Sequence, residues 1–250
     1  MHRKIISTCI ILTLGLIIVG CEKNDKIQVN VSVASSLKDP FLKIEKLYED
    51  KNKDIDLVMN FGSSGSLTQQ IKQGAPCDVF VSASIKYMDE LKKEGYLLDN
   101  KYEELAKNRL VLVSNTNDIK SIDDLKNDEY KKIGVGEINS VPVGQYANEV
   151  ITKEGIKPYI EEKLVYGKDA KEVLAWVVSG NVDAAFLYKS DTNHHKNLNH
   201  YDIDENLHTP IVYPVGVIKE SKNLEQSIEF NNYLLNENTK KMLNDYGYTS

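Results

Sequence analysis

Cysteine is scarce in this sequence, and its scarcity limits both chemistry and architecture. Only Cys9, Cys21 and Cys77 occur in 250 residues, and the first two lie in or beside an N-terminal apolar stretch, so a disulfide framework is excluded. The phosphate loop Gly-x-x-x-x-Gly-Lys-[Ser/Thr] and the dinucleotide fingerprint Gly-x-Gly-x-x-Gly are both missing. Nucleotide binding through either motif is therefore excluded as well.

The sequence also lacks an excess of positive charge. It contains 31 Lys+Arg against 37 Asp+Glu, which gives a formal net charge of −6. An acidic chain without a basic stripe is poorly suited to nucleic acid, so we expect no nucleic-acid partner. For the same reason, any bound anion has to be held by local donors and not by the overall field.

The longest apolar run lies at the N-terminus. A basic start at 2–4 precedes Ile5–Val19, which is short for a membrane span, and the following Gly20-Cys21 completes a segment that resembles a lipobox. We expect residues 1–20 to be a signal peptide, Cys21 to be lipidated, and 21–27 to form a tether to the cell membrane. An uncleaved membrane anchor is the alternative.

The rest of the chain alternates short β-branched segments with amphipathic ones. Strands are expected at 29–33, 55–61, 79–81, 109–114, 133–135, 184–188 and 212–218. Helices are expected at 41–50, 67–73, 85–95, 144–153, 170–179, 224–235 and 239–246. This alternation predicts an α/β protein with mostly parallel sheets flanked by helices. The polar stretch Thr192–His208 is expected to be a long loop.

Four strand-to-helix junctions have a composition suited to anions. They are Ala34-Ser35-Ser36-Leu37, Phe61-Gly62-Ser63-Ser64-Gly65-Ser66-Leu67, Val141-Pro142-Val143-Gly144-Gln145 and Gly167-Lys168-Asp169-Ala170. Helix N-termini expose backbone N–H groups and a positive partial charge, and serine adds hydroxyl donors. Each junction alone is more often a simple helix cap. Four of them in one α/β chain favour an oxyanion site beyond the carboxyl ends of the strands.

The order of these motifs resembles that of a known family. The second junction is followed by Gly74-Ala75-Pro76-Cys77-Asp78-Val79-Phe80-Val81-Ser82-Ala83, and later come the third junction, Tyr188 with Ser190-Asp191, and Tyr213-Pro214-Val215. In this order, from about Val29 to Tyr248, the chain is similar to the periplasmic molybdate-binding proteins of ABC importers. Cys77 stands where the family commonly has alanine.

The resemblance implies a two-lobed type II periplasmic-binding-protein fold with the ligand in the cleft between the lobes. Lobe I would comprise 28–109 and 212–250, and lobe II would comprise 110–211. The implied function is binding of molybdate or tungstate and delivery to an ABC permease, without catalysis and without a further cofactor or metal. We expect a monomer.

The resemblance also implies five ligand contacts. Carried over by motif, these are the hydroxyls of Ser36, Ser64 and Tyr188 and the backbone N–H groups of Val143 and Ala170. Val143 is often alanine in the family, and Ala170 lies in the least distinctive segment. From the residues alone, Tyr188 fits a core tyrosine equally well.

Three other interpretations stay open at this stage. A receptor for sulfate or another tetrahedral oxyanion would need the same donors. A serine-dependent hydrolase is more remote, because Gly62-Ser63-Ser64-Gly65 lacks the Gly-x-Ser-x-Gly spacing of a nucleophile elbow. A metal site among His194, His195, His200 and His208 is conceivable, but their spacing matches no strong ligand motif, and a solvated loop is the simpler reading.

Overall fold

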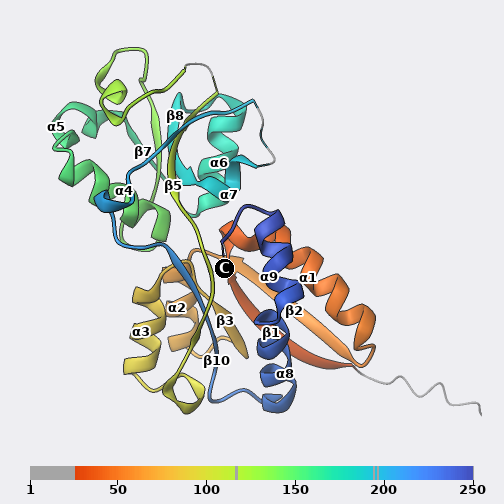
Figure 1. The fold of residues 1–250 in the computed structure, drawn as a ribbon. Coiled ribbons are helices and arrows are strands. Elements are labelled where there is room, and N and C mark those ends of the chain that lie inside the picture. Colours follow the sequence, from red (N-terminus) through yellow and green to blue (C-terminus); the bar gives the residue numbers. More distant parts are fainter. Residues whose placement is uncertain (1–25, 116–117, 194, 196, 250) are drawn as a thin grey trace, which may run out of the picture.

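Two five-stranded sheets, each covered by helices, form the two halves of the molecule (Figure 1). The computed structural model describes residues 26–115, 118–193, 195 and 197–249. The expected signal peptide at 1–20 and the expected lipidation site Cys21 lie outside this part of the chain, as does His194. No helix in the described part is long and apolar enough to cross a membrane.

The first sheet takes strands from both ends of the chain. Its order is β2 (Ile55–Gly62), β1 (Ile27–Ala34), β3 (Val79–Val81), β10 (Val212–Val217) and β4 (Glu103–Lys107). β1 pairs in parallel with β2 and β3, whereas β10 pairs antiparallel with β3 and β4. Four strands therefore run in one direction and β10 runs against them. β1 ends in four consecutive buried residues, as expected for a strand covered on both faces.

The second sheet repeats this plan with the middle of the chain. Its order is β7 (Leu164–Gly167), β6 (Ile133–Gly136), β8 (Ala184–Tyr188), β5 (Leu110–Ser114) and β9 (Asn199–Asp202). β6 is parallel to β7 and β8, and β5 is antiparallel to β8 and β9. Again one strand, β5, opposes the other four.

Helices cover both sheets. Around the first sheet lie α1 (Lys38–Lys51), α2 (Ser64–Lys72), α3 (Ile85–Lys93), α8 (Leu224–Leu234) and α9 (Glu237–Asp245). Around the second lie α4 (Pro142–Lys153), α5 (Lys157–Ile160), α6 (Ala170–Ser179) and α7 (Lys189–Thr192). Short 3-10 helices complete the chain: η1 (Ser35–Leu37), η2 (Leu98–Asn100), η3 (Ile122–Lys126), η4 (Glu161–Lys163) and η5 (Glu205–Leu207).

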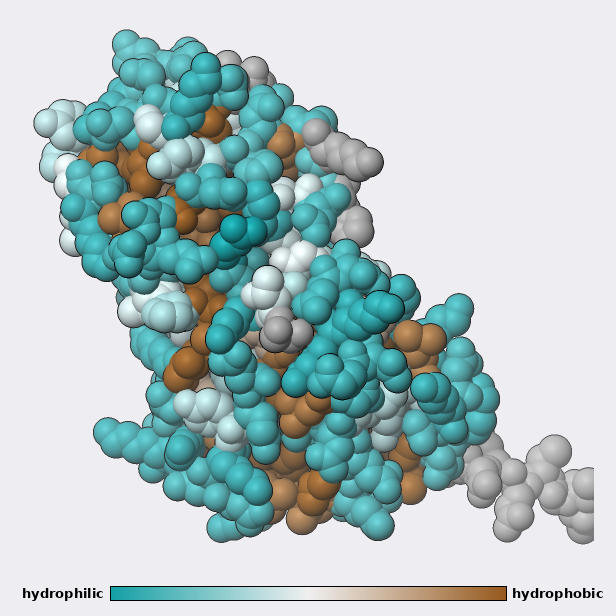
Figure 2. Space-filling view, in the orientation of Figure 1, coloured by the Kyte–Doolittle hydropathy of each residue, from teal (hydrophilic) through white to brown (hydrophobic). Residues whose placement is uncertain are grey.

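The chain passes between the halves twice, and the two crossings touch. β4 leads into β5 through Asn108, and β9 returns to β10 through Ile211. The Asn108 N–H donates to the Ile211 carbonyl at 3.1 Å. Figure 2 shows that the molecule is narrower between the two halves. The visible surface of each half is mostly hydrophilic. Two adjacent crossings of this kind suit a hinge.

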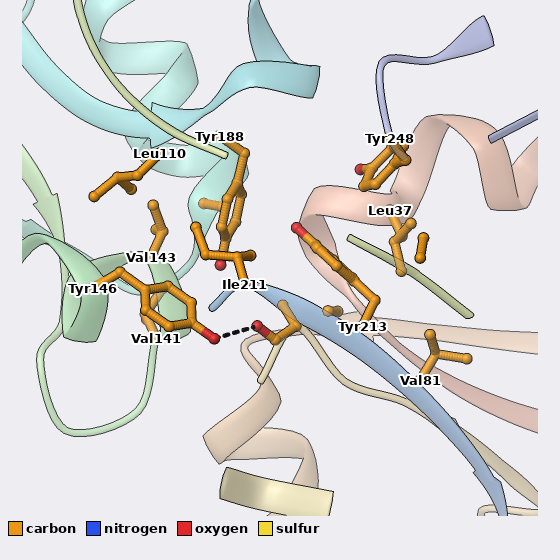
Figure 3. Packing of buried hydrophobic residues seen from close by; sticks show 14 of the residues in the cluster. Leu37, Val81, Leu110, Val141, Val143, Tyr146, Tyr188, Ile211, Tyr213 and Tyr248 are labelled. Atoms are coloured by element: carbon orange, nitrogen blue, oxygen red, sulfur yellow. Dashed lines mark hydrogen bonds between the residues drawn. The ribbon is translucent and has the colours of Figure 1, made fainter. Parts of the chain in front are cut away.

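A continuous buried cluster links the two halves. Tyr188 at the end of β8 meets Tyr213 of β10 edge to face, with ring centroids 5.8 Å apart (Figure 3). Tyr146 of α4 reaches across to the first half, where its hydroxyl donates to the Ala83 carbonyl at 3.3 Å. The halves therefore meet through aromatic side chains at their centre.

The predicted elements are present, but three strands were missed and one loop was wrong. β4, β7 and β9 were not predicted, and the expected loop at 192–208 contains β9. All three are edge strands of only four or five residues, with at most two of them buried, whereas the eight-residue edge strand β2 was predicted. His208 is only 5% exposed, with its Nδ1 2.7 Å from the Thr209 carbonyl, so it is not part of a solvated loop.

Candidate functional site

A small pocket lies where the carboxyl ends of the two sheets face each other. All four predicted junctions contribute to its wall, through Ser36, Ser64, Pro142 and Ala170, and Tyr188 closes the remaining side. The first and last of these residues are 152 positions apart in the chain; four of them follow a strand and Tyr188 ends one, which is where α/β folds place their ligands.

The pocket has room for one small ligand. Its volume is about 10 Å³, little more than the space that one water molecule needs. A pocket this small favours a ligand of a few atoms over a sugar or a peptide. Size alone therefore restricts the candidates to inorganic or very small ligands.

Ser64 is held so that its hydroxyl hydrogen is available to a ligand. It is the first residue of α2, whose N-cap is Ser63, and it is fully buried. The Ala83 N–H donates to Ser64 Oγ at 2.9 Å. Because this oxygen already accepts a hydrogen bond, its own O–H can donate into the pocket.

Ser36 is oriented by a relay of side chains. Asn108 Nδ2, which can only donate, lies 3.4 Å from the Tyr213 hydroxyl, and that hydroxyl lies 3.2 Å from Ser36 Oγ. If the tyrosine accepts from the amide, its own hydrogen points to the serine oxygen, which leaves the Ser36 O–H free for a ligand. The Tyr248 hydroxyl secures the same residue by donating to its carbonyl at 2.8 Å.

Tyr188 carries a buried hydroxyl that has no hydrogen-bond partner in the described part of the chain. The side chain is 1% exposed, and its oxygen is fully enclosed. Burial raises the pKa of Tyr188 well above its ordinary value, so the hydroxyl stays protonated and remains a donor. An unpaired buried hydroxyl costs about 1–3 kcal/mol, and an acceptor in the pocket would remove that cost.

Two helix N-termini face the same region. Ala170 is the first residue of α6 and lines the pocket, while the Asp169 side chain caps the helix by accepting from the Glu172 N–H at 3.0 Å. Val143 is the second residue of α4, and it does not itself line the pocket, although Val141 and Pro142 do. Its N–H has no helical acceptor because of its position in the first turn.

The two halves are in contact around the pocket. The Gly65 N–H at the start of α2 donates to the Ser140 carbonyl at 2.9 Å, and the Tyr87 hydroxyl donates to the Asn139 carbonyl at 3.0 Å. On another side, Lys171 of α6 bonds to Asp39 of α1 at 2.7 Å. The structure is thus a closed arrangement of the halves.

The pocket wall is unsuited to nucleophilic catalysis. Among the described residues that line it there is no histidine, carboxylate or lysine that could take a proton from Ser36 or Ser64. A serine-dependent hydrolase would require such a base.

No metal site is formed in the described part of the chain, where no three His, Cys, Asp or Glu residues come together to hold an ion. His200 instead contacts Lys189, whose ammonium also bonds to Asp202 at 2.9 Å. The histidines at 195, 200 and 208 do not gather into one site.

The structure brings together four of the five predicted contact residues in the pocket wall; the fifth, Val143, follows the lining residue Pro142 in α4 but does not itself line the pocket. The motifs contained Ala83, but its N–H bond to Ser64 was not anticipated. The roles of Asn108 and Lys171 were also missed, because their partners lie 105 and 132 positions away in the chain. No local spacing signals such contacts.

Known proteins with similar sequences support this picture. A protein of Bacillus subtilis, named as an ABC transporter substrate-binding lipoprotein, YvgL, is 36% identical over 96% of this chain and 95% of its own length. The molybdate-binding protein ModA of Haemophilus influenzae is 32% identical over 89% of this chain and 90% of its own.

A solved structure is similar as well. The substrate-binding domain from Clostridium difficile, named for a molybdenum ABC transporter, is 45% identical, with a TM-score of 0.68 over 89% of this chain and 98% of that one. The predicted two-lobed α/β binding-protein fold is confirmed by this likeness. Residues 29–249 match the family described as bacterial extracellular solute-binding proteins. The chain belongs to the family of bacterial extracellular solute-binding proteins.

Proposed function

We propose that this protein captures molybdate or tungstate outside the cytoplasm and delivers it to the permease of an ABC importer. The observation that carries the proposal is the chemistry of the pocket wall. Its side-chain polar groups are all hydroxyls, on Ser35, Ser36, Ser63, Ser64 and Tyr188, and two helix N-termini add N–H donors around them. A ligand that only accepts hydrogen bonds fits this wall.

A fully ionised dianion gains most from such a wall. Its dehydration is costly unless every oxygen is hydrogen-bonded, and each hydrogen bond to a charged group contributes about 1.5–3 kcal/mol. Several neutral donors together can therefore outweigh the cost. Hydrogen phosphate is disfavoured because its remaining proton finds no acceptor, whereas molybdate and tungstate carry no such proton.

The same geometry supports a receptor and not an enzyme. We propose that lobe I (28–109 and 212–250) and lobe II (110–211) close on the ligand about the two crossings at Asn108 and Ile211, with ligand binding favouring the closed state. The protein would act as a monomer and present its closed form to the permease. A lipid on Cys21 would hold it at the cell membrane.

A calorimetric titration of the purified protein with molybdate, tungstate, sulfate and phosphate tests the proposal. We expect tight binding of the first two anions, weaker binding of sulfate and none of phosphate. Sulfate has the same charge and shape as molybdate, so only the size of the cavity separates them. Equal affinity for sulfate would favour a sulfate receptor, and phosphate binding as tight as molybdate binding would contradict the donor-only pocket.

A further inference from the structure

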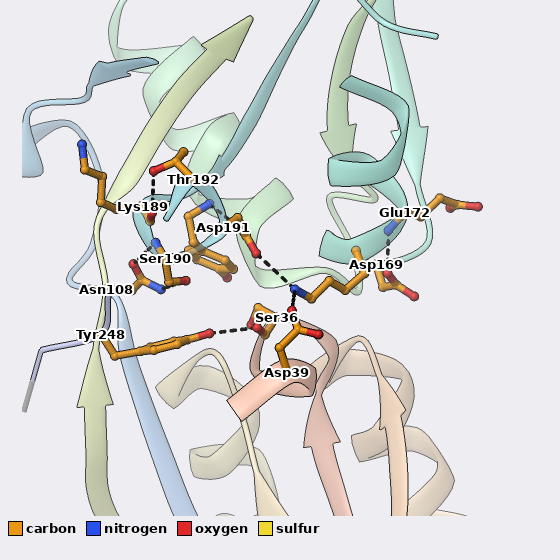
Figure 4. A network of polar contacts seen from close by, with 12 residues as sticks. Ser36, Asp39, Asn108, Asp169, Glu172, Lys189, Ser190, Asp191, Thr192 and Tyr248 are labelled. Carbon is orange, nitrogen blue, oxygen red and sulfur yellow. Dashed lines mark hydrogen bonds and ion pairs between the residues drawn. The ribbon is translucent and has the colours of Figure 1, made fainter. Parts of the chain in front are cut away.

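A single lysine joins the two halves beside the pocket. Lys171 lies in the first turn of α6, directly after the pocket residue Ala170. Its ammonium lies 2.7 Å from Asp39 Oδ2, on α1 of the first half, and 3.7 Å from Asp191 Oδ1, on α7 of its own half. In Figure 4, dashed lines run from Asp191, above, and from Asp39, below, to the same side-chain nitrogen.

The two carboxylates differ in their surroundings. The Asp39 side chain is 54% exposed, whereas that of Asp191 is 1% exposed. Asp191 Oδ2 accepts a hydrogen bond from the Tyr188 N–H at 3.2 Å, and its Oδ1 has no hydrogen-bond partner in the described part of the chain. Burial raises the pKa of Asp191 to about 6, and the positive charge of Lys171 is the largest opposing influence.

The ionised Asp191 side chain is therefore a buried negative charge next to the pocket residue Tyr188, and an incoming dianion would be repelled by it. Other nearby cations are engaged elsewhere: Lys189 pairs with Asp202 at 2.9 Å. The neighbouring carboxylate of Glu172 does not compete for Lys171, because it accepts a hydrogen bond from the Lys168 N–H at 2.7 Å. Of the described residues, Lys171 is the one that forms an ion pair with Asp191.

We propose that Lys171 is a positioning residue that couples anion capture to lobe closure: it neutralises Asp191 behind the pocket and, on closure, bonds to Asp39 across the cleft. The inference rests on the proposed function, because it concerns the same pocket and the same ligand class. Neutralising a buried carboxylate matters for affinity, since a charge left unpaired inside a protein is costly. The ion pair between Lys171 and the exposed Asp39 is weak in water. It therefore stabilises the closed state only slightly.

The test uses the full chain in detergent. Calorimetry measures the affinity for molybdate, and the decrease in radius of gyration on addition of molybdate measures closure. In Lys171→Met, affinity should fall about 10- to 100-fold because Asp191 loses its partner. In Asp39→Asn it should fall by no more than about fivefold. Lys157→Met is the matched control: it removes an exposed lysine of the same half, at the start of α5 and outside the pocket wall, and should leave affinity unchanged.

Two further variants separate charge neutralisation from a merely structural role. Lys171→Arg keeps the charge and should bind within about threefold of the wild type. Asp191→Asn retains an acceptor for the Tyr188 N–H, so adding it to Lys171→Met should restore most of the lost affinity and closure. Loss of affinity in Lys171→Met that Asp191→Asn fails to restore would overturn the proposal, as would wild-type affinity in Lys171→Met.

The same experiment distinguishes failure of the inference from failure of the proposed function. If the wild type does not bind molybdate, the function itself is wrong, and the inference falls with it. If the wild type binds and all lysine variants bind equally, only the inference is wrong. Should Lys171→Met fail to fold, Lys171→Gln carries the test, because it removes the charge and keeps a polar side chain at this partly exposed position. Wild-type affinity in Lys171→Gln would then overturn the proposal.

Discussion

Single hydroxyl groups determine what the pocket can hold. Ser64 Oγ accepts from the Ala83 N–H, and Ser36 Oγ is within 3.2 Å of the Tyr213 hydroxyl. Burial raises the pKa of Tyr213, which therefore stays protonated and able to donate to Ser36. Ser64 Oγ is thus occupied as an acceptor by the protein, and Ser36 Oγ is occupied in the same way when the Tyr213 hydroxyl donates to it; in that arrangement both serine hydrogens are left for a ligand.

Ser36→Ala and Ser64→Ala should each weaken molybdate binding by about 1–3 kcal/mol, through loss of one donor to a charged acceptor. That loss corresponds to roughly 5- to 150-fold in the dissociation constant and is measured by calorimetry. Ser179→Ala, which alters an exposed serine at the end of α6, is the control and should bind normally. Unchanged affinity in both pocket variants would refute the assigned contacts.

Tyr188→Phe should separate binding from stability. Affinity should fall, by less than in the serine variants, because one donor is lost. The free energy of unfolding of the ligand-free protein should not fall, since the deleted hydroxyl has no hydrogen-bond partner in the described part of the chain. Thermal unfolding with and without molybdate measures both, and Tyr166→Phe, at an exposed tyrosine, is the matched control. A large loss of ligand-free stability would show that this hydroxyl is bonded within the protein.

For single residues, the sequence predicted which positions line the pocket but not how their hydroxyl groups are oriented. The order of small residues and serines located the pocket wall, because helix starts after strands have a recognisable composition. The bond from Ala83 to Ser64 and the relay through Asn108 depend on how strands distant in sequence come together. Neither could be inferred from local spacing.

Among the secondary-structure elements, the first turn of α2 makes a close contact with the opposite half, which leaves no room for a side chain at Gly65. Gly65 is its second residue, and a Cβ there would lie 2.6 Å from the Ser140 carbonyl oxygen and 2.8 Å from Ser140 Cα, both in the opposite half. Its N–H also donates to that carbonyl. Glycine at this position therefore allows the halves to approach each other closely.

Gly65→Ala should weaken molybdate binding by about tenfold or more, because the added methyl group opposes closure. It should not destabilise the ligand-free protein, since alanine is a better helix former than glycine by about 1 kcal/mol. Calorimetry gives the affinity and thermal unfolding gives the stability, with Gln69→Ala on the exposed face of α2 as control. Normal binding by Gly65→Ala would show that the contact with Ser140 is dispensable.

The elements were predicted best where they are buried. The central strands at 29–33, 79–81 and 184–188 were recognised because β-branched and apolar residues are needed on both faces of a covered strand. Helices α2 and α4 begin three and two residues earlier than predicted, at Ser64 and Pro142, since their first turns are made of small residues without apolar periodicity. The missed strands β4, β7 and β9 are short as well as peripheral, and four or five residues with at most two buried are too few to establish a strand pattern, whereas the longer edge strand β2 was recognised.

For the whole molecule, the arrangement of the halves explains how neutral donors from both can surround one ligand. Neither half alone provides the site: Ser36 and Ser64 belong to the first sheet and its helices, and Ala170 and Tyr188 to the second. A ligand that contacts both has a higher affinity for the closed form than for the open one, and this difference favours closure.

Membrane attachment is a prediction at the same scale. Cys21→Ser removes the thiol that we expect to be acylated, and a protein with that change should appear in the medium or soluble fraction. Fractionation of cells and immunoblotting measure the distribution, with Cys77→Ser as the control for a buried cysteine that lies outside the tether. Retention of the Cys21 variant at the membrane would argue against a lipid anchor.

A crystal structure of the protein grown with tungstate would test the central claim most directly, because the anomalous signal of tungsten locates the anion. We predict one anion in the pocket between the halves, with its oxygens about 2.6–3.0 Å from Ser36 Oγ, Ser64 Oγ and the Tyr188 hydroxyl. A tungstate bound elsewhere while this pocket holds only water would contradict the account.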